Sequence, residues 1–483
     1  MQAQAEHWTR RRLLAILFLL AGIFFFASPS LAQDEGTGSG ADTQTDGVAP
    51  DGADGGVPLD PSVAIDPLSL ITVVPGGPPV RMSMAVPDAS NLGEGSDKAG
   101  IGDEIVSILR RDFSMSGLFE VLPSETYGGL VDLKRDGMSV SSIDFDGWFN
   151  IGASLLVKVG YRLDGSMVEL DLRLFDVSGS ASGQRIELNW SPTMVRDTAL
   201  RPTVHDFVNA VIEYYTGERG VFGTRILFTG PGEGHLRKLQ SMENDGWGLF
   251  SFEVEQGLHA LPSWGPRGSI FFTTLADEGD GAYQFEDGKL ELIAEGLATG
   301  VDYCSSKGLV ALTLDVEGDS ELFTLDLSSG ELTRLTQMPD SIESSPSWGP
   351  GCSRLAFVSD QTGKPQIYVM NADGSQLTRL TWVGNYNTTP DWSPKGDVIA
   401  FTARDERRVF DIFTVNVSTG EIIRLTQDQG DNEEPSWAPD GRYLVFQSTR
   451  DGRAPRLYMA TSDGRWQTKI SEVSGLKNPA WQR

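Results

Sequence analysis

A Trp-x-Pro motif, repeated in the C-terminal half of the chain, constrains the fold more than any other feature of the sequence. Its copies recur at a period of about 44 residues with several strand patterns in each, which is typical of propeller blades. A degenerate copy has Cys304 at the tryptophan position, and Pro479-Ala480-Trp481 begins one more copy. The complete copies are Trp264-Gly265-Pro266, Trp348-Gly349-Pro350, Trp392-Ser393-Pro394 and Trp437-Ala438-Pro439.

Six segments have the pattern of a blade's second strand, so we expect a six-bladed β-propeller over residues 219–483. The first of them lacks a preceding inner strand, whereas a spare one, Leu476–Trp481, stands at the C-terminus. Placing this strand in the first blade closes the ring and removes two sheet edges. The repeated tryptophans are expected to fill the wedges between blades. The six segments are Thr224–Thr229, Ser269–Thr273, Leu309–Thr313, Arg354–Val358, Asp397–Thr402 and Arg442–Gln447.

Residues 80–218 predict an α/β domain in front of the propeller, which makes the chain an α+β multi-domain protein. Apolar residues recur on one helical face of 98–114, and Asp164-Gly165 is a tight-turn dipeptide between two alternating strands. We therefore expect a sheet with helices packed on it. The expected strands are Val80–Val86, Phe119–Leu122, Leu155–Arg162, Val168–Val177 and Arg185–Leu188, and the expected helices are Lys98–Ser114 and Val204–Tyr215.

The N-terminal residues predict export. A basic group at Arg10–Arg12, the apolar run Leu13–Ala27 and the small residues that follow are typical of a signal peptide over 1–32, cleaved after Ala32. The alternative is a membrane anchor, but the run is shorter than the ~20 residues that cross a bilayer. Residues 33–67 are acidic, rich in Gly and Asp, and expected to form a disordered linker. Residues 68–79 hold a β-prone segment.

The charge balance excludes a class of partner. The chain has 67 Asp and Glu against 39 Lys and Arg, a net charge of -28. Nucleic-acid binding depends on Lys and Arg contacts to phosphates, so we expect no nucleic-acid partner. The expected protein is a periplasmic monomer with no direct membrane insertion and no cofactor.

The only two cysteines are Cys304 and Cys352. Export permits a disulfide, which would close a loop of roughly 50 residues and stabilise the fold by about 4 kcal/mol. Two buried thiols are equally compatible with the sequence.

The Trp-x-Pro-x-Gly turns, the endings Leu335-Thr336, Leu380-Thr381 and Leu425-Thr426, and the closing Pro479-Ala480-Trp481 resemble the TolB family, the periplasmic propeller proteins of the Tol-Pal system. The resemblance covers about residues 68–481. It implies a non-catalytic adaptor that binds the peptidoglycan-associated lipoprotein Pal at the propeller mouth. It also implies contact with TolA through the N-terminal segment, in support of outer-membrane integrity and constriction during cell division.

The resemblance implies two sets of partner-binding residues. The TolA-contacting segment corresponds to Leu68, Ser69, Leu70, Ile71, Thr72, Val73 and Val74. The mouth that binds Pal corresponds to residues in the strands before each tryptophan, which are His259, Ala260, Leu261, Glu343, Ser344, Ser345, Asn387, Thr388, Thr389, Glu433, Glu434, Lys477 and Asn478.

Several of these residues have a second interpretation. The mouth residues can solvate a channel without touching a partner, and Leu68–Val74 can be an edge strand of the α/β domain. Glu433 and Glu434, with Asp431 nearby, offer oxygen ligands to Ca²⁺, although a solvated acidic loop is the simpler interpretation. His205 and Asp206 resemble a catalytic pair, but their place on a helix predicts an exposed surface.

The alternative class of function is a propeller-based hydrolase or ligand-binding module. A serine hydrolase of the α/β type needs a Gly-x-Ser-x-Gly turn, which the chain lacks. His205, His235 and His259 are scattered, with no metal-ligand spacing. We therefore expect no catalytic residues, no metal site and no enzyme activity.

Overall fold

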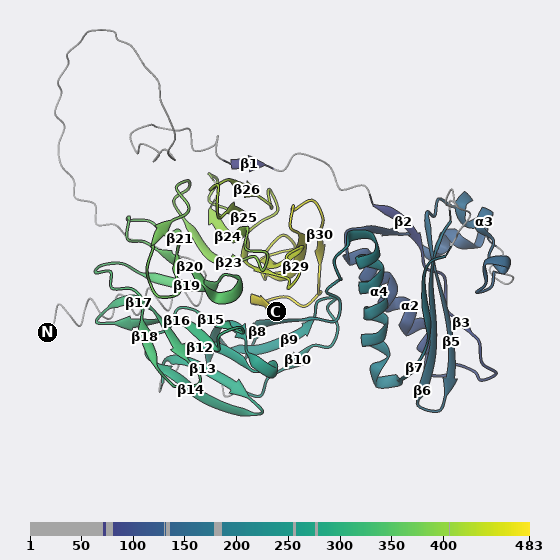
Figure 1. Ribbon diagram of the computed structural model, residues 1–483, viewed down its shortest axis with the longest axis horizontal. Helices are drawn as coiled ribbons and strands as arrows, with labels where there is room; N and C mark the ends of the chain where they lie inside the picture. The colour runs from purple at the N-terminus through teal and green to yellow at the C-terminus, as the bar shows by residue number, and fades with distance from the viewer. Residues whose placement is uncertain are drawn as a thin grey trace, which may run out of the picture. The chain divides into compact units, whose positions relative to one another are not determined.

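The C-terminal part of the chain forms six blades in the computed structural model, which describes residues 71–73, 81–129, 131, 136–177, 186–254, 257–275, 279–404 and 406–483. Each blade pairs four strands antiparallel (Figure 1). The first three blades comprise β31 (Lys477–Trp481), β8 (Arg225–Pro231), β9 (Arg237–Glu243) and β10 (Phe250–Ser251); β11 (Leu258–Trp264), β12 (Ile270–Leu275), β13 (Gly281–Glu286) and β14 (Lys289–Glu295); and β15 (Val301–Cys304), β16 (Leu309–Val316), β17 (Asp319–Asp326) and β18 (Leu332–Arg334).

The other three blades follow the same order from the innermost strand outwards. They comprise β19 (Glu343–Trp348), β20 (Arg354–Ser359), β21 (Gln366–Asn371) and β22 (Thr378–Arg379); β23 (Asn387–Trp392), β24 (Val398–Arg404), β25 (Phe410–Asn416) and β26 (Ile422–Arg424); and β27 (Asn432–Trp437), β28 (Tyr443–Ser448), β29 (Arg456–Thr461) and β30 (Gln467–Lys469). Short 3₁₀ turns at Pro266–Gly268 and Pro350–Cys352 follow two of the tryptophans.

The C-terminal strand closes the ring. β31 pairs antiparallel with β8, with Lys477 opposite Thr229 and Trp481 opposite Ile226, beside the C-terminus marked in Figure 1. The inner strands of successive blades contact one another around the whole circle, including β27 with β31 and β31 with β11. The prediction of six blades closed by the last strand is confirmed.

Buried tryptophans fill the seams between blades, as expected for a large flat side chain in a wedge. Trp348, Trp392, Trp437 and Trp481 are all buried. In the third blade the structure places Tyr303 in that position, one residue before the predicted Cys304, because its backbone N–H bonds to Oγ of Ser263 as that of Trp392 bonds to Ser347, and its ring stacks on Phe271. The neighbouring Cys304 forms a disulfide with Cys352 in the next blade, 48 residues further along. The disulfide joins the third and fourth blades at the seam that Trp348 also fills, and it is the correct one of the two interpretations.

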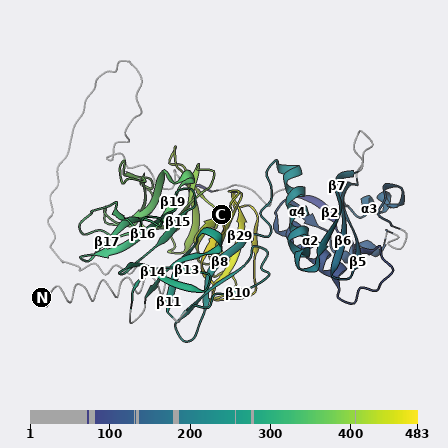
Figure 2. The ribbon, with the colours of Figure 1, turned by 60° about the horizontal axis from the view of Figure 1, so that its bottom comes forward.

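The α/β domain has one sheet in the order β4-β2-β5-β6-β7, with β3 also paired to β5. Helices α2 and α4 lie on one face of this sheet and α3 on the other (Figure 2). The elements are β2 (Met82–Ala85), β3 (Ser90–Asn91), α2 (Ile101–Met115), β4 (Phe119–Val121), α3 (Phe145–Asn150), β5 (Leu155–Asp164), β6 (Met167–Asp176), β7 (Ile186–Arg196) and α4 (Leu200–Thr216), with 3₁₀ turns at Ser124–Gly129, Val140–Ser142 and Asp197–Ala199.

Alternation along the strands creates the two cores. Met84 packs with the α2 and α4 side, whereas its neighbour Ala85 packs with the α3 side. The carboxylate of Asp97 accepts hydrogen bonds from the backbone N–H groups of Gly100 and Gly102, both at 2.9 Å, so α2 starts three residues later than the apolar pattern predicts. Gly217, with φ 78°, ends α4 in the left-handed conformation.

The segment β1 (Ile71–Val73) pairs parallel with β26, the outermost strand of the fifth blade. The interpretation of Leu68–Val74 as an edge strand of the α/β domain is therefore wrong, because the paired residues join the propeller. The predicted signal peptide, the linker over 33–67 and residues 68–70 and 74 lie outside the described residues. None of the described helices has the length and hydropathy needed to cross a membrane.

Candidate functional site

The six inner strands place the predicted mouth residues around one channel. In each of five blades the predicted mouth residues lie in the first half of the inner strand, before the tryptophan that ends it. These inner strands are β11, β19, β23, β27 and β31. The structure thus brings together residues from five blades that are spread over more than two hundred positions of the sequence. The third blade contributes β15, in which the sequence offered no candidate.

Five of these strands share a β-bulge that the repeat pattern did not predict. The bulge residue has a positive φ and precedes the proline: Leu261 at 49°, Ser345 at 51°, Thr389 at 47°, Glu434 at 58° and Asn478 at 51°. The pairing with the second strand shifts register at each of these places. A proline disfavours the right-handed helical region for the residue before it, so the chain turns through the left-handed region instead.

Left-handed backbone costs a non-glycine residue on the order of 1 kcal/mol or more, and such strain concentrates at functional sites. In the third blade the equivalent place is taken by Gly300. A Cβ there would lie 2.6 Å from Cδ of Pro346 and 2.9 Å from Cα of Ser345. The absence of a side chain therefore lets the third and fourth blades approach closely at the bulge level.

The bulges border a cavity of about 890 Å³ that extends towards the tryptophan end of the channel. All five bulge residues line it, together with Asp302, Asp391 and the C-terminal Arg483. The channel thus has a mouth, where the inner strands begin, and a chamber beyond the bulges. Predicted mouth residues border both spaces.

Two carboxylates of the chamber connect successive blades. Asp302 accepts hydrogen bonds from Oγ of Ser263 at 3.1 Å and from the backbone N–H of Trp348 at 2.7 Å. Asp391 accepts the equivalent hydrogen bonds from Oγ of Ser347 at 3.2 Å and from the backbone N–H of Trp437 at 2.6 Å. It also forms an ion pair with Arg483. Burial raises the pKa of Asp302 to about 6. These residues align the inner strands, a role that the sequence pattern did not reveal.

Glu433 and Glu434 are half-buried in the channel wall. Burial, with the neighbouring charges of Glu434 and Asp431, raises the pKa of Glu433 to about 8. Glu434 accepts hydrogen bonds from the backbone N–H of Asn478 at 2.7 Å and from its Nδ2 at 2.8 Å. Glu434 therefore ties the last blade to the closing strand.

The remaining mouth residues differ in accessibility. Glu343 is 0% exposed, and burial raises its pKa to about 7, while its Oε1 accepts hydrogen bonds from Ser341 and Ser359. His259, Ala260, Ser344, Ser345, Asn387 and Thr388 are also buried, whereas Leu261, Thr389, Lys477 and Asn478 are half-buried. The half-buried residues are the ones a partner can reach without rearrangement of the strands.

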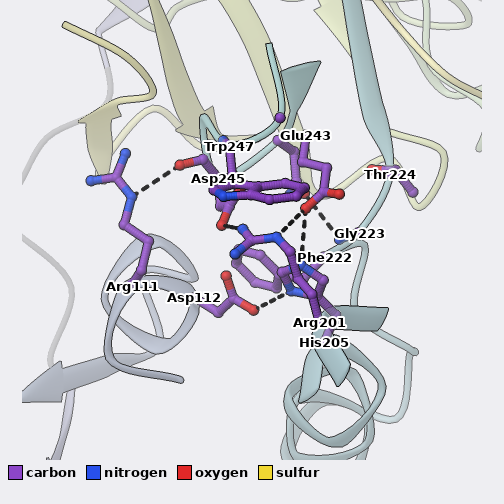
Figure 3. A network of polar contacts seen from close by, with 12 residues as sticks. Arg111, Asp112, Arg201, His205, Phe222, Gly223, Thr224, Glu243, Asp245 and Trp247 are labelled. Atoms are coloured by element: carbon purple, nitrogen blue, oxygen red, sulfur yellow. Dashed lines mark hydrogen bonds and ion pairs between the residues drawn. The ribbon is translucent and has the colours of Figure 1, made fainter. Parts of the chain in front are cut away.

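A second polar cluster joins the α/β domain to the first blade (Figure 3). Nδ1 of His205 in α4 lies 2.6 Å from Oδ2 of Asp112 in α2, and its Nε2 lies 3.1 Å from Oε2 of Glu243 at the end of β9. Arg201, one helical turn before His205, donates to Glu243 at 2.6 Å and forms an ion pair with Asp245. We call these five residues the interdomain cluster.

The prediction of an exposed helix surface at His205 is wrong. His205 is 2% exposed, because its side of α4 faces α2 and the propeller rather than solvent. Burial alone would lower the pKa of His205, but the hydrogen bonds to Asp112 and Glu243 prevail and raise it to about 9. Burial raises the pKa of Asp112 to about 6, against the hydrogen bond from His205.

Ligand atoms of His205, Glu243 and Asp245 lie within 4.8 Å of one another, a spacing compatible with a metal ion. The guanidinium of Arg201 already bridges the two carboxylates, and its Cζ lies 4.5 Å from the centroid of the Trp247 ring. Arg201 thus supplies the positive charge that the carboxylates need. The backbone carbonyl of Asp245 also accepts a hydrogen bond from Nε of Arg111 at 3.1 Å, which adds α2 to the contact.

Two family models match the chain. The model described as the TolB beta propeller domain matches residues 212–483, and the model described as the TolB amino-terminal domain matches residues 71–183. The crystal structure of TolB from Acinetobacter baumannii superposes with a TM-score of 0.70 at 22% identity, over 84% of this chain and 97% of that chain. This likeness concerns the fold.

Curated relatives carry the name Tol-Pal system protein TolB. The relative from Anaeromyxobacter dehalogenans is 37% identical over 281 residues, which are 57% of this chain and 62% of the relative. The relative from Gluconobacter oxydans is 30% identical over 312 residues, 63% of this chain and 65% of the relative. The matches thus span less than two thirds of the length of these relatives.

Proposed function

This chain belongs to the TolB family, and we propose that it is a non-catalytic periplasmic adaptor that binds the lipoprotein Pal at its propeller mouth and TolA through its N-terminal segment. In this role it supports outer-membrane integrity and constriction during cell division. The protein reaches the periplasm through the signal peptide over 1–32, which is cleaved after Ala32.

The convergence of the mouth residues is the observation that supports Pal binding. Five blades bring their pre-tryptophan residues to one channel, and five of these residues hold a strained left-handed backbone. Strain of this kind is retained where the surrounding structure fixes a geometry for binding. The half-buried set of Leu261, Thr389, Lys477 and Asn478 offers apolar, hydroxyl, cationic and amide groups within a confined space.

The backbone of β1 supports TolA binding through the N-terminal segment. Ile71–Val73 is extended and pairs in parallel with a single neighbour, β26. An extended segment can add as a strand to the open edge of a partner's sheet, with main-chain hydrogen bonds for affinity. We propose that residues 68–74 bind TolA in this way, and that this binding is linked to Pal binding in a reciprocal manner.

Co-purification from a periplasmic extract tests the proposal. The mature chain, used as bait, is expected to capture a lipoprotein with a peptidoglycan-binding domain and a TolA-like protein, both identified by mass spectrometry. A variant that lacks residues 68–74 serves as the matched control, because it is expected to lose TolA, to capture the lipoprotein with an altered affinity and to keep its thermal midpoint. Capture of neither protein by the complete mature chain would contradict the proposal.

A further inference from the structure

Trp382 is the most exposed of the large apolar side chains among the described residues, at 68%. It lies in the connection between β22 and β23, directly after Leu380-Thr381. The third and fifth blades carry glutamine at the same place, Gln337 and Gln427. The blade architecture therefore does not require an aromatic residue here, and the tryptophan needs another explanation.

The connection that carries Trp382 is fixed by hydrogen bonds. Nδ2 of Asn387 donates to the carbonyl of Val383 at 2.9 Å, and Nε2 of Gln366 donates to the carbonyl of Gly384 at 3.3 Å. The guanidinium of Arg379 lies 4.5 Å from the indole centroid and is itself held by the carbonyl of Thr381 at 2.7 Å. The indole is thus presented in a defined place, which lowers the entropic cost of binding.

The strand directions place Trp382 on the face of the propeller at which the channel mouth opens. The inner strand β23 runs from Asn387, next to this connection, to Trp392 at the opposite end of the channel. Trp382 therefore belongs to the end at which the predicted Pal contacts Asn387 and Thr388 lie. Exposed tryptophans at a protein surface are the residues that most often carry the binding energy of an interface, because they bury a large area on contact.

We propose that Trp382 is the anchor of the Pal interface, and that its indole inserts into an apolar pocket of the lipoprotein bordered by carboxylates that face Arg379. The inference rests on the proposed function, since it names the residue by which the mouth holds this partner. Arg379 covers one side of the ring with positive charge, so the pocket that receives the indole meets a cation at its rim. A carboxylate there gains a charge-assisted contact.

Calorimetric titration with the soluble domain of the lipoprotein tests this assignment. Trp382→Gln introduces the residue that the third and fifth blades carry, so the fold is retained. We expect this variant to bind at least about 30-fold more weakly than the parent chain. The matched control is Trp247→Gln, because Trp247 is 56% exposed in the turn between β9 and β10, at the tryptophan end of the propeller. This variant is expected to bind like the parent.

The outcomes separate the inference from the proposed function. If the parent binds and Trp382→Gln binds with the same affinity, the anchor assignment is wrong while the adaptor role stands. Equal losses in Trp382→Gln and Trp247→Gln would also overturn it, since the effect would not be local to the mouth. If the parent does not bind the lipoprotein at all, the proposed function fails, and the anchor assignment fails with it.

Discussion

Nε2 of His205 lies 3.1 Å from Oε2 of Glu243, and this contact connects a helix of the α/β domain to the first blade of the propeller. The same imidazole is bonded to Asp112 through Nδ1. One protonated side chain thus contacts two carboxylates from separate parts of the chain. The charge of His205 therefore contributes to the contact between the two domains.

Stability is expected to fall as the pH rises from about 6.5 to about 9.5. The pKa of His205 is raised to about 9 in the folded chain, so the native state holds a proton that the unfolded chain releases at lower pH. The contribution of His205 to the free energy of unfolding is complete below the pKa that it has in the unfolded chain. It is lost as the pH rises through the pKa that it has in the folded chain. The loss is on the order of 2 kcal/mol, measured as a lower thermal midpoint by calorimetry.

The variant His205→Gln is the control for this pH dependence. It removes the titrating group, so its midpoint is expected to be lower than that of the parent at pH 6.5 and to change less between pH 6.5 and 9.5. The pKa of Glu243 is lowered, because its hydrogen bonds with His205 and Arg201 outweigh the effect of burial. Its contribution to the free energy of unfolding is therefore lost only as the pH falls. If the thermal midpoint of the variant falls with pH as steeply as that of the parent, His205 is not the cause of the pH dependence.

Reduction of the disulfide is expected to destabilise the propeller by about 4 kcal/mol in the chain-entropy model, because Cys304 and Cys352 close a loop of 48 residues. The double variant Cys304→Ser, Cys352→Ser should show the same loss. A thiol reductant should lower the midpoint of the parent but not that of the double variant. If the reductant leaves the thermal midpoint of the parent unchanged, the disulfide does not stabilise the propeller.

Ring closure predicts a large effect of Trp481→Ala. Trp481 is buried, and its Nε1 donates to Oγ1 of Thr224 at 2.8 Å, where the C-terminal strand meets the start of the first blade. The substitution leaves a cavity and removes this hydrogen bond, at an expected cost of about 3–5 kcal/mol in the free energy of unfolding. Denaturant titration measures this cost. Leu249→Ala, at a leucine that is 50% exposed, should change it by less than about 0.5 kcal/mol.

The bulges predict that Ser345→Gly stabilises the chain by about 1 kcal/mol, because glycine adopts a positive φ without strain. Ser344→Gly is a matched control, because both serines have buried hydroxyls without a hydrogen-bond partner, but Ser344 pairs in β19 with Val358. It should destabilise by a similar amount. Equal changes in the denaturation midpoints of both variants would show that the left-handed backbone is not strained.

The periodic motif made the propeller predictable. Each Trp-x-Pro marks the end of an inner strand, so the number of blades and the closing strand Leu476–Trp481 followed from counting. The left-handed bulges were not foreseen, although each bulge residue precedes a proline that stands two residues before a tryptophan. The five bulge residues are Leu261, Ser345, Thr389, Glu434 and Asn478. That recurrence was the available signal.

The interdomain cluster could not be predicted from local patterns. His205 lies beside Val204 and Phe207 on α4, and helical periodicity does not say whether another domain covers the remaining side. Its partners Asp112 and Glu243 are 93 and 38 residues away in the sequence. Trp382 was missed for a related reason, since it stands outside the repeated motif whose tryptophans all serve packing.

Calorimetric titration of the mature chain with the soluble domain of the peptidoglycan-associated lipoprotein tests the central claim most directly. The account predicts saturable one-to-one binding that Leu261→Asp weakens at least tenfold, because the substitution places a charge at a half-buried mouth position whose left-handed backbone aspartate tolerates. The thermal midpoint of this variant should stay close to that of the parent. No heat of binding with the unaltered chain, or unchanged affinity in a folded Leu261→Asp variant, would contradict the account.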